Sequence, residues 1–319
     1  GGKESMSTKH EGWGWMLAVD FFFAGMGGGM VLITGLLELF AGSGRLSLLG
    51  NVMGPLFMCI GCGFLILELG RPFQAWRVFM NPKAILTAGA WLMSVAIVAG
   101  LVYASFDLDP AWFKQDKLIW QDWNMLRKLL AVVCAITGLV VATYPGVLLG
   151  RHKGRPFWVG PGIMTLFMLS SIVTGTAAHF VSALIYPPSS VPGIWHHLPA
   201  FAGGLLFFQL IGWIGYIWIK RTGTSAAEAA SALKWINGQY ADSFKAAFLF
   251  VGTLVPLVLV MIPSTLCQGI GSLLVLVGGV VMRCLVVYAG EDRTWIPGEQ
   301  KYRKRLPTGN EAFLKAWSR

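Results

Sequence analysis

Residues 16–40 read MLAVDFFFAGMGGGMVLITGLLELF. As a helix with a rise of 1.5 Å per residue, this run is long enough to cross a hydrocarbon core about 30 Å thick. It contains two acidic residues, Asp20 and Glu38, and no basic residue. A continuous apolar run of this kind predicts a membrane-spanning helix rather than a barrel strand, because barrel strands alternate apolar and polar residues over about ten positions.

Similar runs recur along the whole chain. Of its 319 residues, 55% are hydrophobic and 13% are charged, with a mean hydropathy of +0.63, whereas soluble domains have about 25% charged residues. The apolar runs fall at 16–40, 49–67, 84–106, 126–150, 159–186, 197–219, 245–262 and 266–289. We therefore expect an all-α integral membrane protein with eight transmembrane helices, and a short surface helix within 222–243.

An even number of spans places both termini on one face of the membrane, which we call side A. Side A carries 19 of the 25 Lys and Arg residues, and side B carries five. The positive-inside rule then assigns side A to the cytoplasm. Topology and lipid headgroups account for the net charge of +10, so membrane lipid is an expected contact and nucleic acid is not.

The cysteines and histidines argue against several redox cofactors in this chain. The five cysteines form no repeated CxxC pair, so neither an iron–sulfur cluster nor a metal site is expected. We interpret Cys59 and Cys62, three residues apart, as small residues at a helix contact. His179 is the one histidine well inside a span, and haem b commonly needs pairs of histidines. No haem is therefore expected.

Four polar residues on four different spans lie near side A. They are Asp20, Glu68, Tyr144 and Arg283. The alternating direction of the chain puts all of them in the same leaflet. Because a charge at the centre of a membrane helix costs on the order of 2.5–3.5 kcal/mol, this convergence predicts a functional site.

Each of these residues also has an ordinary explanation. Asp20 can accept hydrogen bonds from a neighbouring helix, and Tyr144 can belong to an interfacial aromatic belt. Glu68 and Arg71 are spaced as a helical ion pair. The guanidinium of Arg283 can reach lipid headgroups.

Two further ionisable residues lie near side B. Glu38 and His179 are candidates for a proton path, although a hydrogen-bonded structural histidine is an alternative. The glycine-rich stretch 25–29 permits close helix contact or leaves room for a flat ligand. Glu38 and His179, opposite the carboxyl groups of side A, motivate an alternative function as a secondary transporter or proton-conducting subunit. A purely structural anchor is a third interpretation.

Several stretches, taken together in order, resemble the NrfD/polysulfide reductase membrane-subunit family. These are WMLAVDFFFAGMGGG at 15–29, LELGRP at 67–72, TYPG at 143–146, GRPFW at 154–158 and RCLVVYAG at 283–290. The resemblance extends over nearly the whole chain in the number and spacing of its spans.

The resemblance implies two four-helix bundles in the inner membrane of a prokaryote. The first, residues 16–150, would contain a quinone site, and the second would comprise residues 151–290. An N-terminal segment, 1–15, and a basic tail, 291–319, would flank them.

The resemblance also implies a quinone-reactive membrane anchor without a redox cofactor of its own. It would pass electrons between menaquinone, or another quinone, and a ferredoxin-like iron–sulfur subunit. That subunit would connect to a molybdopterin subunit that carries the catalytic metal centre.

Three residues match the family's quinone-binding and proton-exchanging positions: Asp20, Glu68 and Tyr144. Arg71 and Arg283 are expected to support them. The polysulfide reductase branch has histidine at the position matched by Asp20, so the family's hydrogen bond to the quinone and its proton destination do not carry over directly to this position.

One expectation from the family conflicts with the charge distribution. In the best-known branch, the iron–sulfur partner lies outside the cytoplasm on the quinone side. Here the quinone side is the Lys/Arg-rich side A. Either the partner subunits face the cytoplasm, or side A is basic because it binds an acidic partner.

Overall fold

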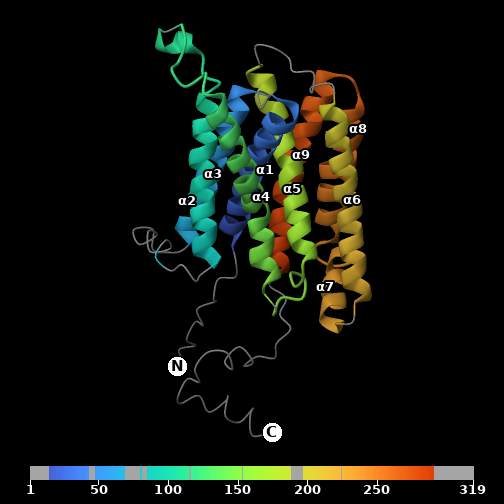
Figure 1. Ribbon diagram of the computed structural model, residues 1–319. Helices are drawn as coiled ribbons and strands as arrows, with labels where there is room; N and C mark the ends of the chain where they lie inside the picture. The colour runs from blue at the N-terminus through green and yellow to red at the C-terminus, as the bar shows by residue number, and fades with distance from the viewer. Residues whose placement is uncertain are drawn as a thin grey trace, which may run out of the picture.

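The chain is described by a computed structural model at residues 14–42, 47–68, 80, 85–114, 116–152, 154–187, 197–223 and 225–290. These parts form helices and turns, and no strand is found among them (Figure 1). The helices are α1 (Trp15–Ala41), α2 (Leu48–Glu68), α3 (Ile85–Ser105), η2 (Pro110–Phe113), α4 (Asn124–Gly150), α5 (Gly162–Ile185), α6 (Leu198–Thr222), α7 (Ala226–Ile236), η4 (Ser243–Leu254), α8 (Val255–Met261) and α9 (Thr265–Ala289).

The expectation of eight spans is confirmed. Within the described residues, eight helices are long and apolar enough to cross a membrane, and η4 with α8 forms the seventh. The expected surface helix is α7. The spans differ from the predicted ranges by only a few residues at each end, because hydrophobicity marks the membrane core while capping and turns set the ends of a helix.

The seventh span has an irregular winding. Its first part, η4, is a π-helix, and in its last turn the Thr253 hydroxyl bonds to the Phe248 carbonyl five residues earlier. Long π-helices are rare, and sequence hydrophobicity cannot indicate one. Pro256 follows in the first turn of α8, where its missing N–H is tolerated.

The spans alternate in direction, and α1 begins at the end of the molecule where α9 ends and where α7 lies (Figure 1). This end is side A. The short helix η2, in the connection between α3 and α4, lies at the opposite end, side B.

The helices pack as two groups that share a broad contact. Helices α1 to α4 pack on one another, as do α5, α6, η4–α8 and α9, and α1 and α4 also lie against α5. This arrangement agrees with two four-helix bundles. The predicted boundary near residue 150 falls at the end of α4 but stays a prediction, because the contact between the groups is so extensive.

Helix α1 owes its central position to glycine. A Cβ on Gly27 would lie 2.5 Å from the Gly54 carbonyl oxygen of α2, and one on Gly28 would lie 3.0 Å from the Ala142 nitrogen of α4. Gly29 faces the backbone of α5 at Ser171. The glycine stretch therefore serves close helix contact, which is how small residues promote association where no hydrophobic effect operates.

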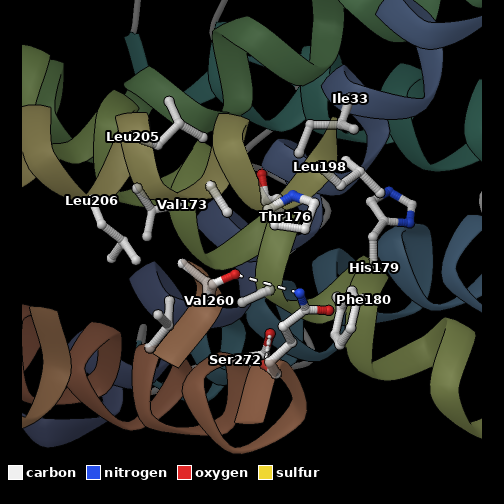
Figure 2. Close-up of a pocket in the computed structure, with 15 residues that line it drawn as sticks. Ile33, Val173, Thr176, His179, Phe180, Leu198, Leu205, Leu206, Val260 and Ser272 are labelled. Carbon is white, nitrogen blue, oxygen red and sulfur yellow. Dashed lines mark hydrogen bonds between the residues drawn. The ribbon is translucent and has the colours of Figure 1, made fainter. Parts of the chain in front are cut away.

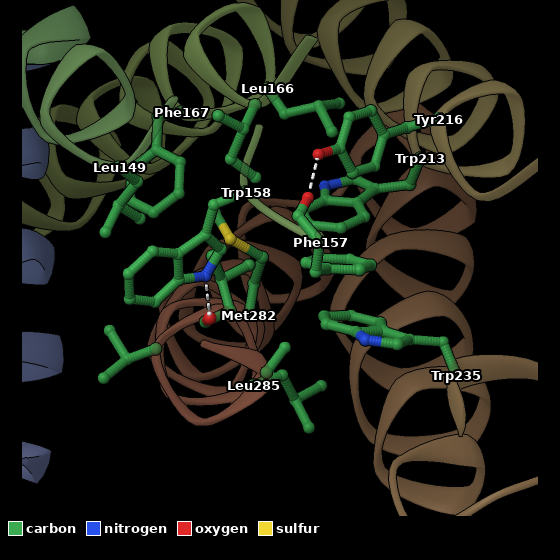
Figure 3. Packing of buried hydrophobic residues seen from close by; sticks show 14 of the residues in the cluster. Leu149, Phe157, Trp158, Leu166, Phe167, Trp213, Tyr216, Trp235, Met282 and Leu285 are labelled. Atoms are coloured by element: carbon green, nitrogen blue, oxygen red, sulfur yellow. Dashed lines mark hydrogen bonds between the residues drawn. The ribbon is translucent and has the colours of Figure 1, made fainter. Parts of the chain in front are cut away.

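Aromatic residues fix the connection between the two groups on side A (Figure 3). The rings of Trp213 and Trp235 stack at 5.6 Å, and Phe157 stacks on Trp235 at 4.4 Å. The Trp158 indole donates a hydrogen bond of 2.6 Å to the Val286 carbonyl, and the Tyr216 hydroxyl donates to the Phe157 carbonyl. The connection after α4 is thereby held against α6, α7 and α9.

A glycine substitution tests this close packing. A Cβ on Gly138 of α4 would lie 2.5 Å from the Leu32 nitrogen of α1. We expect Gly138→Ala to force α1 and α4 apart and to lower the free energy of unfolding by about 1–3 kcal/mol, measured by thermal unfolding in detergent. Gly63→Ala is the control, because nothing lies within 4 Å of its added methyl group. Equal stability of the two variants would contradict the packing described.

Candidate functional site

Two of the four predicted side A residues come together inside the first helix group. The Asp20 side chain of α1 is only 4% exposed. It interacts electrostatically with Tyr144 of α4 and with Cys62 of α2. The structure therefore brings a carboxyl group and a phenol from separate spans to one place.

Two glycines leave room for these side chains. A Cβ on Gly61 of α2 would lie 3.1 Å from Asp20 Oδ1. A Cβ on Gly89 of α3 would lie 2.5 Å from the Tyr144 ring and 2.9 Å from its hydroxyl oxygen. All four helices of the first group thus contribute to the surroundings of Asp20 and Tyr144.

The Tyr144 hydroxyl oxygen is buried and has no hydrogen-bond partner among the residues that the structure describes. Buried hydroxyl groups are normally paired, so an unpaired one indicates a missing partner. Tyr144 also precedes Pro145, which lies inside α4 and cannot donate a backbone hydrogen bond to Val141. The phenol therefore sits at a weakened turn of its helix.

Sequence reasoning missed two sulfur-bearing residues near this site. Cys62 Sγ lies 2.9 Å from Met93 Sδ of α3, and Met93 is 7% exposed. The sequence indicates Cys62 only as a helix-contact residue, since its spacing from Cys59 says nothing about Asp20. No signal in the sequence pairs Cys62 with Met93.

The structure does not test the predictions for Glu68 and Arg71. Helix α2 ends at Glu68, whose side chain lies outside the described residues, as does Arg71. Their expected roles stay predictions.

The headgroup explanation of Arg283 is wrong. Its side chain is 0% exposed, and its guanidinium donates to the Phe21 carbonyl at 2.9 Å. It bonds inside the protein because glycine in α1 leaves space for it.

A second polar cluster lies toward side B. Arg127 of α4 pairs with Glu38 of α1 at 3.1 Å and with Asp107 at 3.3 Å, and all three side chains are buried. Tyr103 donates a hydrogen bond of 2.8 Å to Glu38 and accepts one of 3.2 Å from Arg127. We call these four residues the side B cluster. It joins α1, α3 and α4 near the membrane surface.

The side B cluster continues to His179. Asn51 donates to Asp107 at 3.1 Å and accepts from Thr34 at 2.9 Å, and Thr34 lies 3.2 Å from His179 Nε2. His179 Nε2 also lies 2.9 Å from the Met30 carbonyl. Since a carbonyl can only accept, Nε2 carries the hydrogen.

The expected proton path through Glu38 and His179 stays a prediction. The structure places both residues in one network, but the Asn51 amide lies between them, and an amide does not readily gain and lose protons as a carboxyl group does. On α1 the network comes nearest to Asp20 at the Met30 carbonyl, about 15 Å along the helix at 1.5 Å per residue. The two polar regions are therefore separate.

Arg127 and Asp107 were not among the predicted site residues. The sequence places Arg127 at the start of a span and Asp107 in a connection, where ordinary surface charges occur. Only the tertiary packing of α3 on α4 shows that the two are buried together.

A small, mostly apolar cavity of about 40 Å³ lies in the second helix group (Figure 2). It opens between α5, α6, α8 and α9 and is lined by Thr176, His179, Gln268 and Ser272 among apolar side chains. The Gln268 amide already donates to the Val260 and Ile262 carbonyls. The lining of this cavity is therefore mostly apolar, whereas Asp20 and Tyr144 bring a carboxyl group and a phenol together in the first helix group.

Comparison with known proteins identifies the family. The sequence model described as "Polysulphide reductase, NrfD" matches residues 4–293. The chain belongs to the NrfD family. It is 25% identical over 304 residues to the C chain of polysulfide reductase from Wolinella succinogenes, a match that covers 88% of this protein and 94% of the relative. It is 23% identical over 190 residues to protein NrfD of Escherichia coli, 54% of this protein and 60% of the relative.

Membership of the NrfD family confirms the resemblance inferred from the motifs. It agrees with a multi-pass membrane protein of eight spans. The name of the Wolinella relative describes it as one chain of a reductase.

The side B cluster makes a testable contribution to stability in this NrfD-family protein. Arg127→Met would leave Glu38 and Asp107 buried without their cation. Removing one partner of a buried ion pair costs about 3–5 kcal/mol, so we expect a large drop in the unfolding temperature in detergent. Lys128→Met is the control, since Lys128 is exposed. If both variants melt together, the cluster does not stabilise the first helix group.

Proposed function

We propose that this NrfD-family protein carries electrons between membrane quinone and an extrinsic iron–sulfur subunit of a respiratory oxidoreductase. The quinone ring would bind beside Asp20 and Tyr144. The observation that carries this proposal is the buried Tyr144 hydroxyl, which lies near a buried carboxyl group and has no partner among the described residues.

The residues present fit a quinone. A quinone has an apolar ring with two carbonyl oxygens, and its redox chemistry involves two electrons and two protons. The Tyr144 hydroxyl can donate a hydrogen bond to one carbonyl oxygen, and Asp20 can exchange a proton. Gly61 and Gly89 pack closely against these two groups, and a Cβ at either position would contact them. Met93 adds a polarizable apolar surface.

Menaquinone is the quinone that the family resemblance favours. The same resemblance favours a ferredoxin-like iron–sulfur partner and a molybdopterin catalytic subunit beyond it. The name of the Wolinella relative, one chain of a polysulfide reductase, supports a multi-subunit complex. The catalytic metal centre would then belong to a partner, and this chain would supply the quinone reaction.

The partner would bind on side A, the face nearer to Asp20 and Tyr144. Arg151, Arg221 and Lys245 are exposed there. Burial lowers the pKa of His152 below its ordinary value, and the nearby Arg155 lowers it further. His152 is therefore neutral at pH 7, and the lysines and arginines supply the charge that would attract an acidic partner.

The orientation in a prokaryotic inner membrane has a direct test. We propose that side A faces the cytoplasm, because it carries most Lys and Arg residues. A single cysteine placed within 299–310, in a variant without other cysteines, should resist an impermeant maleimide in intact cells and react after permeabilisation. Labelling in intact cells would instead place side A outside the cytoplasm.

Substitution of the two site residues tests the quinone reaction. Asp20→Ala removes a proton-exchanging group and should lower quinol-coupled turnover on the order of 100-fold. Tyr144→Phe removes one hydrogen bond and should lower it about five-fold. The isolated complex should keep its activity with artificial dyes, because they bypass the quinone site.

Thr143→Ala is the matched control for the tyrosine variant. Thr143 is adjacent in α4, and its hydroxyl bonds to the Leu139 and Val140 carbonyls of its own helix. Normal quinol kinetics in both Asp20→Ala and Tyr144→Phe would refute the proposed site. Isolation of the protein without any iron–sulfur protein would favour the transporter alternative.

A further inference from the structure

Arg283 is a fully buried cation in the membrane-spanning part of α9. Its Nε donates to the Phe21 carbonyl at 2.9 Å, and its Nη2 donates to Ser171 Oγ at 3.3 Å. Its Nη1 donates to Ser170 Oγ and to the Gly279 carbonyl, both at 3.1 Å. These acceptors are neutral and come from α1, α5 and α9.

Aromatic rings and missing side chains complete the surroundings of this guanidinium. Its central carbon lies 5.5 Å from the Phe22 ring and 5.9 Å from the Phe167 ring. A Cβ on Gly25 would lie 2.8 Å from Nη2 and 2.7 Å from Ser171 Oγ. The packing is thus shaped to hold a planar, five-donor group at one fixed place.

One bond of Arg283 reaches the turn of α1 that carries Asp20. The Phe21 carbonyl belongs to the residue that follows Asp20. A charge-assisted hydrogen bond to this backbone group restrains the depth and rotation of α1 at that point. The position of the Asp20 carboxyl group therefore depends on a residue of the second helix group.

A second bond reaches the turn of α4 that carries Tyr144. The Ser171 hydroxyl accepts from Arg283 and itself donates a hydrogen bond of 3.2 Å to the Ala142 carbonyl. This carbonyl lies two residues before Tyr144, in the turn where Pro145 removes a backbone hydrogen bond. The proline leaves the neighbouring Val141 carbonyl without its helical donor, and Ser171 adds a bond from α5 to the next carbonyl of the same turn.

We propose that Arg283 is a positioning residue of the quinone site, acting on Asp20 through the Phe21 carbonyl and on Tyr144 through Ser171. The second helix group thereby sets the geometry of a site in the first group. This inference rests on the proposed quinone function. The experiment below distinguishes a failure of the positioning role from a failure of that function.

The test compares two adjacent serines of α5. Ser171→Ala removes the connection from Arg283 to α4. Ser170→Ala is the matched control, because it removes an acceptor of Arg283 with no side-chain bond to α4. The readout is the equilibrium affinity of the purified complex for heptyl hydroxyquinoline N-oxide, a fluorescent quinone analogue. We expect about three- to ten-fold weaker binding for Ser171→Ala, the effect of one hydrogen bond, and less than two-fold for Ser170→Ala.

A double-mutant cycle distinguishes positioning from a general effect on folding. If Ser171 acts through Tyr144, Ser171→Ala should weaken binding no further in a Tyr144→Phe background. An equal loss in both backgrounds would overturn the connection to Tyr144. Arg283→Lys keeps the charge but not the planar set of donors. It should therefore lower the affinity for the analogue at least as much as Ser171→Ala does.

The site variants separate failure of this inference from failure of the proposed function. If Asp20→Asn and Tyr144→Phe leave the affinity unchanged, the analogue does not bind at the proposed site and the quinone proposal fails. If they weaken binding while Ser171→Ala and Arg283→Lys do not, only the positioning role fails. Thermal unfolding of each variant shows that it is folded, and Ser171→Ala, which removes a single hydroxyl group, tests the inference even if Arg283→Lys does not fold.

Discussion

The close contact of α1 with its neighbours is the constraint on which the rest of the structure depends. Lipid chains are as apolar as the side chains facing them, so helices in a membrane associate through tight packing and internal hydrogen bonds. Glycines at 27–29 bring the backbones of α2, α4 and α5 against α1. The same short distances allow Asp20 to meet Tyr144, and the space beside Gly25 receives the guanidinium of Arg283.

Much of the fold could be predicted because a bilayer restricts a polypeptide to few solutions. Long apolar runs must become helices, so their number, order and direction follow from the sequence. The depth of Asp20, Tyr144 and Arg283 follows as well. Hydrophobicity does not predict which faces of the helices meet. The sequence therefore indicated that these residues share a leaflet, but not that Arg283 lies among neutral oxygen atoms.

The side B cluster shows this limit of prediction from the sequence more clearly. Arg127 and Asp107 occupy positions where exposed charges are common, and nothing in the sequence marks them as partners. Their pairing depends on the packing of α3 and α4, which no single helix encodes. Glu38 is conspicuous in the sequence because it lies inside an apolar run, and Arg127 is its buried cationic partner in the structure.

Asp20 lies near the side A end of α1, about 15 Å along the helix from Met30, where the side B network reaches this helix through His179. An elementary charge that crosses a whole membrane gains or loses about 2.3 kcal/mol per 100 mV. Asp20 lies only about 8 Å along the helix from its start at Trp15. A proton exchanged between Asp20 and side A would therefore cross a small part of the field, and such a reaction would be nearly indifferent to the voltage that the cell maintains.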